Sequence, residues 1–522
     1  MIVKKRIDLR KSYDQIKAKA KKYVERSHYE KGLRQMEYAA SIAWRFPVLS
    51  EFVDDELERM IEHVTDALLP DLVIENSDTG LACKEGRRVV FYNGQIIDNG
   101  ALCEQYLIFL LSHGYRILFI VPDSRNTKAG KNILTRLSTN RNVEIFIPES
   151  RSKIEKIRQI TDKVRQFNPH FSFLHFLPND VVGYASFVKF NNHRRYYIVH
   201  NDHTFWLGKG CGDYFLEFRQ LGVRITMDKR SIDRTKIVHL PFYPIDSGVS
   251  FKGFPADFSN KVVGLSGANL YKYFKDPELK YFHAIKKLIE NHSNFVFCLC
   301  GNGNPEQVEW IHSFIKEYRL EERFYYLGNR PDFYALVGNI DIMFESYPIG
   351  GGLTMLFAIN QGVAMTGIGS KTTFPGPTEE YLDFAEYQQP VTFDEFEKDA
   401  SKLISDPLYR ENNVKIFSQA LAKREDFDSK LENILLEGEN YTDPLKFNLI
   451  VKCPEDSDFD MFFNDGDKLG EMYKRAWISS FINGKWLMRI CSLLITLRYS
   501  GMRSVIARVR TFYVKSLTAR RK

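Results

Sequence analysis

The feature of this 522-residue sequence that most constrains its fold is a regular alternation of short apolar runs with helix-periodic segments. The alternation occurs as two series, one beginning near residue 87 and the other near residue 261. Short apolar runs that alternate with helices are typical of parallel strands covered by helices on both faces. We therefore predict an α/β protein that contains two Rossmann-like domains.

Each series consists of recognisable strand and helix segments. The first contains strands in VVFYNG, RILFIVPD, VEIFIPES, FSFLHFLPND and RRYYIVHND, with a charged helix over residues 151–167. The second contains strands in KVVGLSG, FVFCLCGNGN, RFYYLGN, DIMFES and VAMTGIG. The segment between the series, YPIDSGVSFKGFPADFSN, has the Gly and Pro content of a domain junction.

The chain extends beyond both series. Residues 1–86 show apolar positions at helical spacing, which predicts a helical N-terminal extension. We assign residues 87–246 to the first Rossmann-like domain and residues 247–437 to the second. Residues 438–522 are predicted to form a linker and a basic, amphipathic helical tail.

Composition argues against several other classes of protein. Apolar residues make up 44% and charged residues 27% of the chain, and no stretch approaches the roughly 20 apolar residues that span a bilayer. The start, MIVKKRIDLRKSYDQ, lacks the apolar core and cleavage site of a signal peptide, so we expect a cytoplasmic protein. Scattered cysteines and an acidic DSDFD run outside both series predict neither disulfides nor a metal site.

A glycine triplet is the strongest single motif. Gly350, Gly351 and Gly352 lie between a predicted strand and a helix that begins near Leu353. Glycines let the backbone approach a ligand closely, and a helix N-terminus presents N–H groups to an anion. The triplet is therefore a candidate phosphate-binding loop, with an ordinary tight turn as the alternative.

Three segments resemble the GT-B glycosyltransferases: HNDHTFWLGKGCGDYFLEFR, LSGANLYKYFKDPEL and ESYPIGGGLTMLFAINQG. The resemblance covers about residues 87–425. It is greatest to the branch that contains the O-linked N-acetylglucosamine transferases and the bacterial cytoplasmic N-glucosyltransferases. It implies two Rossmann-like domains facing a cleft, with the first on the acceptor side and the second binding a nucleotide sugar.

The resemblance also implies residues that bind the donor sugar. A lysine in a segment like LYKYFKDP neutralises the donor diphosphate, which here is Lys272 or, in a shifted alignment, Lys275. The glycine triplet with Thr354, and the loop residues Asn329 and Arg330, are further candidates. For Arg330, a surface salt bridge is the alternative.

Two departures from related patterns bear on mechanism and specificity. Retaining GT-B enzymes have two glutamates eight residues apart around this loop, whereas here Glu345 is followed eight residues later by Leu353. We therefore expect an inverting transfer. The branch has an aspartate for the donor ribose where this chain has Phe357.

Candidate catalytic residues follow a predicted strand of the first domain. His200, Asp202 and His203 come directly after RRYYIV, and ligands of open α/β sheets bind at the carboxyl ends of strands. Inverting transfer needs a base that deprotonates the acceptor, and a His or Asp side chain can do this near neutral pH. Hydrogen bonding of one histidine to a backbone carbonyl is the alternative.

Three further residues are candidates for the acceptor side. Asn99 and Gly100 lie in the first strand-to-helix loop, where a plain turn is the alternative. Trp206 has a ring that can stack on a sugar, and packing within the domain is the alternative.

These features together predict a glycosyltransferase that uses a nucleotide diphosphate sugar, UDP-linked, and a surface-glycan or lipid-linked acceptor. The alternatives are a protein O- or N-glycosyltransferase, a noncatalytic sugar-nucleotide or glycan-binding protein, and a UDP-sugar epimerase. We expect no cofactor, no metal and no nucleic-acid partner.

The predicted tail suggests a further partner. Residues 472–522 contain no Asp or Glu, whereas Lys and Arg recur among apolar residues at helical spacing. Such helices bind anionic membrane surfaces, so we predict a peripheral association with the inner face of the cell membrane. Packing against the Rossmann-like domains and a basic RNA-binding arm are the alternatives.

Overall fold

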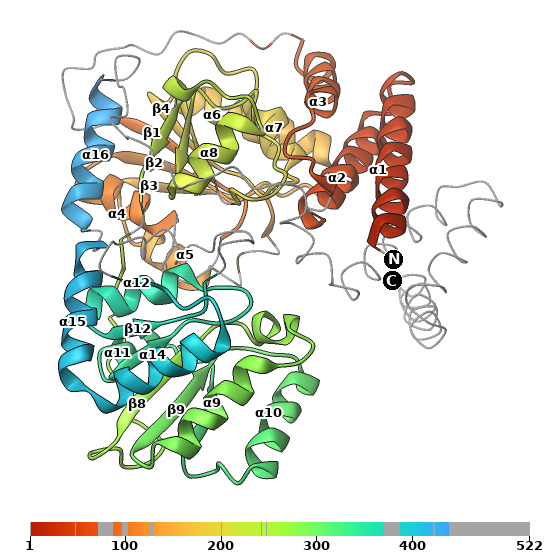
Figure 1. Ribbon diagram of the computed structural model, residues 1–522. Coiled ribbons are helices and arrows are strands. Elements are labelled where there is room, and N and C mark those ends of the chain that lie inside the picture. Colours follow the sequence, from red (N-terminus) through yellow and green to blue (C-terminus); the bar gives the residue numbers. More distant parts are fainter. Residues whose placement is uncertain are drawn as a thin grey trace, which may run out of the picture.

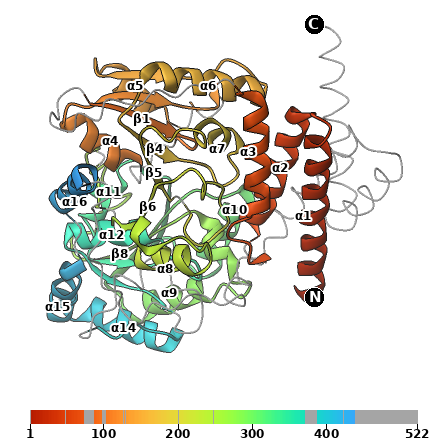
Figure 2. The same ribbon diagram turned by 90° about the horizontal axis from the view of Figure 1, so that it is seen from above.

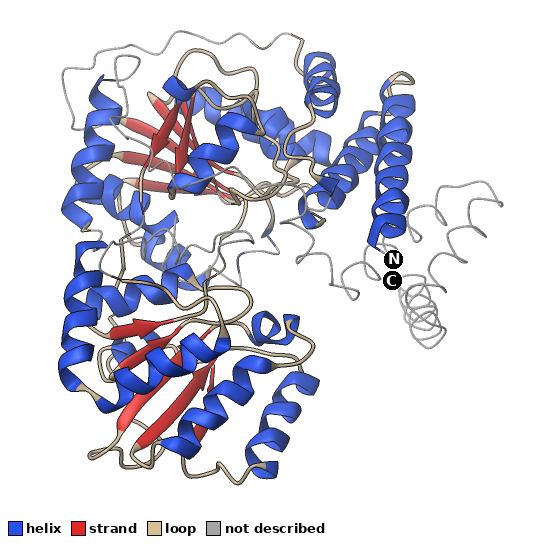
Figure 3. Cartoon of the chain, in the orientation of Figure 1, coloured by secondary structure: helices blue, strands red, loops and turns tan. Residues whose placement is uncertain are grey.

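The computed structural model describes residues 2–46, 49–70, 72, 87–96, 103–124, 127, 130–199, 201–241, 243–246, 248–369, 387–420 and 423–437. Within them the chain forms two α/β domains, each built on its own parallel sheet, and helices of an N-terminal extension lie along one side (Figures 1 and 3). The predicted α/β class with two Rossmann-like domains is confirmed.

The N-terminal extension contains the helices α1 (Ile2–Val24), α2 (Tyr29–Arg45) and α3 (Asp55–Leu68). Asp54 caps α3, because its Oδ1 accepts the Leu57 N–H at 2.9 Å. Its Oδ2 accepts hydrogen bonds from the Tyr13 hydroxyl at 2.5 Å and the Lys17 ammonium at 2.7 Å. One carboxylate thus caps α3 and ties it to α1.

The first domain has a parallel sheet in the strand order β3-β2-β1-β4-β5-β6-β7. Its strands are β1 (Arg88–Asn93), β2 (Arg116–Ile120), β3 (Val143–Phe146), β4 (Phe171–His175), β5 (Arg194–Ile198), β6 (Tyr214–Glu217) and β7 (Ile237–His239). Its helices are α4 (Cys103–Ser112), α5 (Lys131–Ser138), α6 (Lys153–Phe167), α7 (Val181–Phe187) and α8 (Gln220–Asp228). The strand order is that of a Rossmann domain, with the switch point between β1 and β4.

Alternate residues of the central strands are buried in two different hydrophobic cores, one on each face of the sheet. Val90 and Tyr92 face a core formed with α1 to α3, α6 and α7, whereas Val89 and Phe91 face a core with α4 and α5. This follows from strand geometry, since successive side chains point to opposite faces. Full burial of each large apolar side chain contributes about 1.5–3 kcal/mol. The extension therefore packs on helices α6 and α7 and enlarges the core on this side of the first sheet.

The second domain has a parallel sheet in the order β10-β9-β8-β11-β12. Its strands are β8 (Val262–Gly267), β9 (Phe295–Cys300), β10 (Phe324–Gly328), β11 (Ile342–Phe344) and β12 (Ala364–Thr366). Its helices are α9 (Lys280–Asn291), α10 (Pro305–Glu317), α11 (Phe333–Val337), α12 (Gly352–Gln361), α14 (Phe393–Ser405) and α15 (Pro407–Phe417). The switch point lies between β8 and β11.

Helix α16 (Arg424–Glu437) returns to the first domain after the second is complete. Phe427 and Leu431 are buried in the core around β1 and α4, and the Phe427 ring lies 5.2 Å from that of Tyr106. Figures 1 and 2 show α16 on the side of the first domain opposite α1 to α3. The predicted boundary, which placed residues 424–437 with the second domain, is therefore wrong for this helix.

Two predictions for the ends of the chain have different outcomes. Helices are observed within 2–68 of the predicted N-terminal extension, whereas the predicted tail at 472–522 lies outside the described residues. Among the residues that the structure does describe, no helix has both the length and the apolar character to cross a membrane. In the same residues, no group of His, Cys, Asp and Glu side chains is arranged to hold a metal ion.

Candidate functional site

The switch point of the second sheet brings together two loops predicted to bind the donor sugar. The 3-10 helix η4 (Leu270–Lys275) follows β8, and the glycine loop follows β11, which pairs directly with β8. Ligands of open α/β sheets bind at such points, beyond the carboxyl ends of the strands. The local order strand, glycine loop, helix then places the N-terminus of α12 at the same edge.

The Lys272 side chain, from η4, contacts the glycine loop. Its ammonium Nζ donates a hydrogen bond to the Gly350 carbonyl oxygen at 2.6 Å. Burial lowers the pKa of Lys272, and the Glu345 carboxylate opposes this shift. Of the two candidate lysines on this 3-10 helix, Lys272 is the one whose hydrogen bond to the glycine loop is established.

The glycine loop is shaped to begin helix α12. A Cβ atom on Gly351 would lie 2.7 Å from Thr354 Oγ1, so a larger residue crowds the first turn. The Thr354 hydroxyl donates to the Gly351 carbonyl oxygen at 2.6 Å, which stabilises the loop. Within the described residues, no side chain caps this helix N-terminus. Its first N–H groups and dipole therefore suit an anion next to Lys272.

The loop that follows β9 packs against the start of η4, the 3-10 helix that carries Lys272. Gly301, at the end of β9, has φ +143°, and a Cβ atom there would lie 1.7 Å from the Ala268 carbonyl oxygen. The backbone carbonyl oxygen of the next residue, Asn302, accepts a hydrogen bond from the Leu270 N–H at 2.8 Å. The close approach of the two backbones thus fixes the start of η4.

We expect Gly301→Ala to destabilise the second domain by about 3 kcal/mol or more, because the added methyl meets backbone and the φ angle is strained. The melting temperature should fall by at least about 5 °C in calorimetry. Gly328→Ala is the matched control, since Gly328 has φ +62° but open space around its Cβ position. Equal melting temperatures for the two variants would contradict the crowding argument.

Of the two donor-binding candidates in the loop after β10, Arg330 bonds to groups of the protein itself and Asn329 is exposed. Arg330 Nε donates to Asp332 Oδ1 at 2.7 Å, and its Nη2 donates to the Gly253 carbonyl oxygen at 3.1 Å. Arg330 lowers the pKa of Asp332 to about 2. Arg330 therefore forms a largely buried ion pair with Asp332, rather than a surface one, and its bond to Gly253 ties the loop after β10 to the segment between the domains. Asn329 is exposed beside it.

Asp202 and His203 form a hydrogen-bonded pair after β5. His203 Nδ1 lies 2.9 Å from Asp202 Oδ1, and the His203 side chain is 29% exposed whereas that of Asp202 is 1% exposed. The buried Arg219 side chain donates to both carboxylate oxygens of Asp202. Burial alone raises the pKa of Asp202, but Arg219 and His203 more than offset this and hold it well below its ordinary value.

This arrangement divides the roles of the two predicted bases. Asp202 stays ionised and engaged, so it is a poor proton acceptor and instead orients the His203 ring. With Nδ1–H directed to Asp202, the neutral tautomer has Nε2 as its basic nitrogen. His203 is therefore the candidate base.

The backbone on both sides of His203 is held by a buried arginine. Arg230 Nη2 donates to the carbonyl oxygens of Asp202 at 2.7 Å and Thr204 at 2.6 Å. The Arg230 guanidinium also lies over the Trp206 ring, 4.6 Å from its centre. Trp206 is 1% exposed and stacks on Tyr197. It therefore packs the domain, and the prediction that it contacts an acceptor is wrong.

The remaining first-domain candidates, Asn99, Gly100 and His200, lie outside the described residues. At the β1–β4 switch point, the structure shows two polar residues that the sequence analysis did not select. His175 Nδ1 lies 3.0 Å from Asn93 Oδ1, and both side chains are buried at the ends of paired strands. Asn93 could have been found because it ends the apolar run VVFY, whereas His175 lies inside the run FSFLHFL.

Glu217 at the end of β6 was also missed. Burial raises its pKa to about 8, and the Thr226 hydroxyl donates a hydrogen bond to it. The Glu217 carboxylate lies close to the Asp202 side chain, since a Cβ atom on Gly222 would contact both. Glu217 thus belongs to the buried polar network beneath the His203 segment.

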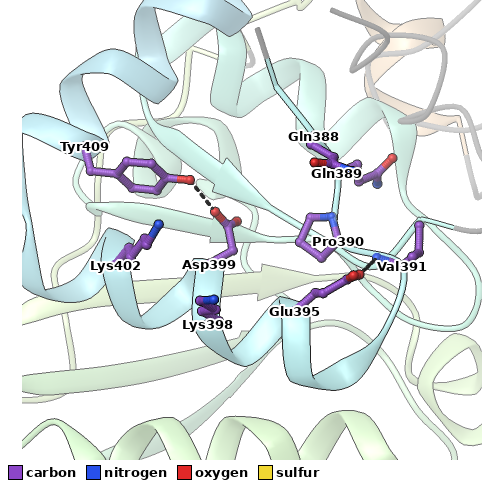
Figure 4. Close-up of a pocket in the computed structure, with 9 residues that line it drawn as sticks. All are labelled: Gln388, Gln389, Pro390, Val391, Glu395, Lys398, Asp399, Lys402 and Tyr409. Carbon is purple, nitrogen blue, oxygen red and sulfur yellow. Dashed lines mark hydrogen bonds between the residues drawn. The ribbon is translucent and has the colours of Figure 1, made fainter. Parts of the chain in front are cut away.

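A separate pocket of about 260 Å³ lies between residues 388–391 and helices α14 and α15 (Figure 4). Its Asp399 carboxylate accepts hydrogen bonds from the Tyr409 hydroxyl at 2.7 Å and the Thr366 hydroxyl at 2.6 Å. Glu395 in turn accepts the Val391 N–H at 2.8 Å. Both carboxylates therefore have structural partners, and the predicted site residues are not among those lining this pocket.

Comparisons with known proteins agree with this architecture. No protein-family model and no curated protein sequence matches the chain. Among solved structures, a glycosyltransferase from Rickettsia africae ESF-5 is similar, with 13% identity and a TM-score of 0.53, over 67% of this chain and 98% of that one. A putative UDP-N-acetylglucosamine 2-epimerase from Listeria monocytogenes has 11% identity and a TM-score of 0.50, over 69% and 99%.

A third similar structure is HepE from Anabaena in complex with UDP and glucose, with 14% identity and a TM-score of 0.49, over 66% of this chain and 98% of that one. At identities this low, the two matches with TM-scores of 0.53 and 0.50 show the fold alone. The strand orders of the two sheets and the return of α16 to the first domain are consistent with it. The chain therefore has the GT-B fold, in which two Rossmann-like domains face each other.

Proposed function

We propose that the chain is a glycosyltransferase that transfers a sugar from a nucleotide diphosphate sugar, UDP-linked, to an acceptor hydroxyl. The observation that carries this proposal is the convergence of Lys272, the glycine loop and the N-terminus of α12 at the switch point of the second sheet. A positive side chain and a helix N-terminus at one place suit a diphosphate.

The chemistry that we propose is an inverting displacement. The acceptor oxygen attacks the anomeric carbon, the bond from that carbon to the diphosphate oxygen breaks, and His203 Nε2 takes the acceptor proton. Asp202 orients the ring and stabilises the positive charge that it gains. Lys272 and the α12 N-terminus stabilise the negative charge on the leaving diphosphate.

The acceptor and the location belong to the same proposal. We propose a surface-glycan or lipid-linked acceptor and a cytoplasmic protein whose residues 472–522 bind an anionic membrane surface. The support is the basic, amphipathic sequence of that segment.

A screen of nucleotide sugars tests the proposed activity. Thermal shift first identifies the nucleotide sugars that bind, and product analysis then follows each binder with candidate acceptors. Release of free nucleotide together with a new glycosidic bond supports transfer. Interconversion of free nucleotide sugars indicates an epimerase instead, and binding without turnover indicates a binding protein.

We also expect transfer to proceed without a divalent metal, because Lys272 and α12 supply the positive charge that a metal supplies elsewhere. Activity should remain within about twofold of its initial value after treatment with EDTA, since less than about 0.5 kcal/mol of barrier is at stake. A loss of turnover that magnesium restores would contradict this expectation. Nucleotide binding measured in the same buffers shows which step is affected.

A further inference from the structure

The N-terminal extension contacts the His203 segment through one buried carboxylate. Glu58 on α3 is 4% exposed, and its two oxygens accept three consecutive backbone N–H groups. Gly208 and Lys209 donate to Oε1 at 2.8 and 3.1 Å, and Gly210 donates to Oε2 at 3.0 Å. Burial raises the pKa of Glu58 to about 7, and the three backbone N–H groups oppose this shift because they stabilise the ionised carboxylate. One side chain of the extension thus holds a whole loop.

The loop sequence is suited to this contact. Gly208 has φ +143°, and a Cβ atom there would lie 2.1 Å from the Tyr197 ring. A Cβ atom on Gly210 would lie 2.4 Å from the Tyr184 hydroxyl. The glycines of the WLGKG motif therefore let the backbone approach both the domain core and the Glu58 carboxylate.

A second part of the extension contacts the arginine that holds the His203 backbone. The Phe52 ring, just before α3, lies against the Arg230 guanidinium, 5.5 Å from ring centre to carbon. Lys209 adds an ion pair with Asp55 at the start of α3, at 3.1 Å. The segment from Asp202 to Gly210 is therefore held between α3 and Arg230.

We propose that helix α3 is part of the transfer site, in which Glu58 positions the Asp202–His203 pair by holding the Gly208–Gly210 backbone. This inference rests on the proposed function, because the base that is positioned is His203. Glu58 is a positioning residue: it acts on the reaction through the loop, whereas His203 acts on the acceptor. The helical extension then has a role in the reaction besides packing on α6 and α7.

The test compares Glu58→Gln with Glu62→Gln. The first variant keeps the shape of the side chain but replaces one acceptor oxygen with a donor facing an N–H group. Glu62 lies one turn further along α3 and shares the Tyr184 hydroxyl with Glu58, at 2.7 and 3.1 Å, whereas the three loop N–H groups donate to Glu58. Glu62→Gln therefore changes the same tyrosine contact and the same charge on α3 while leaving the loop contacts in place. Glu58→Gln should lower kcat by about tenfold to a hundredfold through misplacement of the base, with the KM for the nucleotide sugar unchanged within about twofold. Glu62→Gln should retain wild-type kcat.

Hydrogen exchange of the backbone amides in residues 202–212 provides a readout that does not depend on turnover. Exchange should be about tenfold faster in Glu58→Gln, on the scale of one lost charge-assisted hydrogen bond, and unchanged in Glu62→Gln. If Glu58→Gln does not fold, Gly210→Ala is the second variant: its methyl group crowds the Tyr184 hydroxyl and the Glu62 carboxylate, moves the loop away from α3 and should give the same loss of kcat.

The outcomes separate the inference from the proposed function. Wild-type kcat in Glu58→Gln would overturn the positioning role, as would an equal loss of nucleotide affinity and kcat. A wild-type protein that transfers no sugar would contradict the proposed function. In that case, unchanged exchange of residues 202–212 in Glu58→Gln would also overturn the positioning role, and faster exchange there would support it.

Discussion

Substitution of His203 by alanine should lower kcat by about a hundredfold or more, because general base catalysis contributes about 10²–10⁴-fold. The affinity for UDP should remain unchanged, since the proposed diphosphate site is built from the second domain. Steady-state kinetics with saturating acceptor, together with calorimetric titration of UDP, measure the two effects separately. The expected pattern is therefore a catalytic defect without a binding defect.

Two further variants serve for comparison: one replaces an exposed histidine of the second domain, and the other changes Asp202, the partner of His203. His312, an exposed histidine on α10, can be replaced by alanine in the second domain with little expected change in kcat. Asp202→Asn should also lower kcat, but it leaves the buried Arg219 without its anionic partner and should lower the melting temperature as well. Wild-type turnover in His203→Ala would exclude His203 as the base.

Substitution of Lys272 by alanine should weaken UDP binding by about tenfold to 150-fold, the range that corresponds to about 1.5–3 kcal/mol for a charge-assisted hydrogen bond. The expected loss concerns the diphosphate, so the affinity for uridine itself should change little. Titration calorimetry with UDP and with uridine tests both statements. A loss that is equal for the two ligands would indicate damage to the pocket rather than to the charge contact.

Lys275→Ala is the matched control, because Lys275 lies on the same 3-10 helix three residues further on. It should retain UDP affinity within about twofold, which is about 0.4 kcal/mol. A larger loss in Lys275→Ala than in Lys272→Ala would reverse the assignment. The melting temperatures of both variants show whether loss of the Lys272 contact with Gly350 also affects stability.

Much of the architecture was predictable because strand and helix periods are local properties of sequence. The runs VVFYNG and KVVGLSG were predicted as strands and form β1 and β8, and the charged segment at 151–167 forms α6. The glycine triplet was also predicted as a special loop, and in the structure a side chain on Gly351 would crowd Thr354. The position of α16 could not be predicted, because its apolar residues indicate that the helix packs on a domain but not which domain it packs on.

What the sequence by itself determined is the alternation of strands and helices, hence two Rossmann-like domains, and the segments that carry Lys272, His203 and the glycines. Only the tertiary structure decided which of these residues meet. It placed Lys272 on the Gly350 carbonyl, paired Asp202 with Arg219 so that His203 is the candidate base, and buried Trp206. It also brought Glu58 to the Gly208 loop, 150 residues away in sequence. Periodicity specifies which face of an element is apolar, whereas partners distant in sequence are selected by packing and by the need to satisfy buried polar groups.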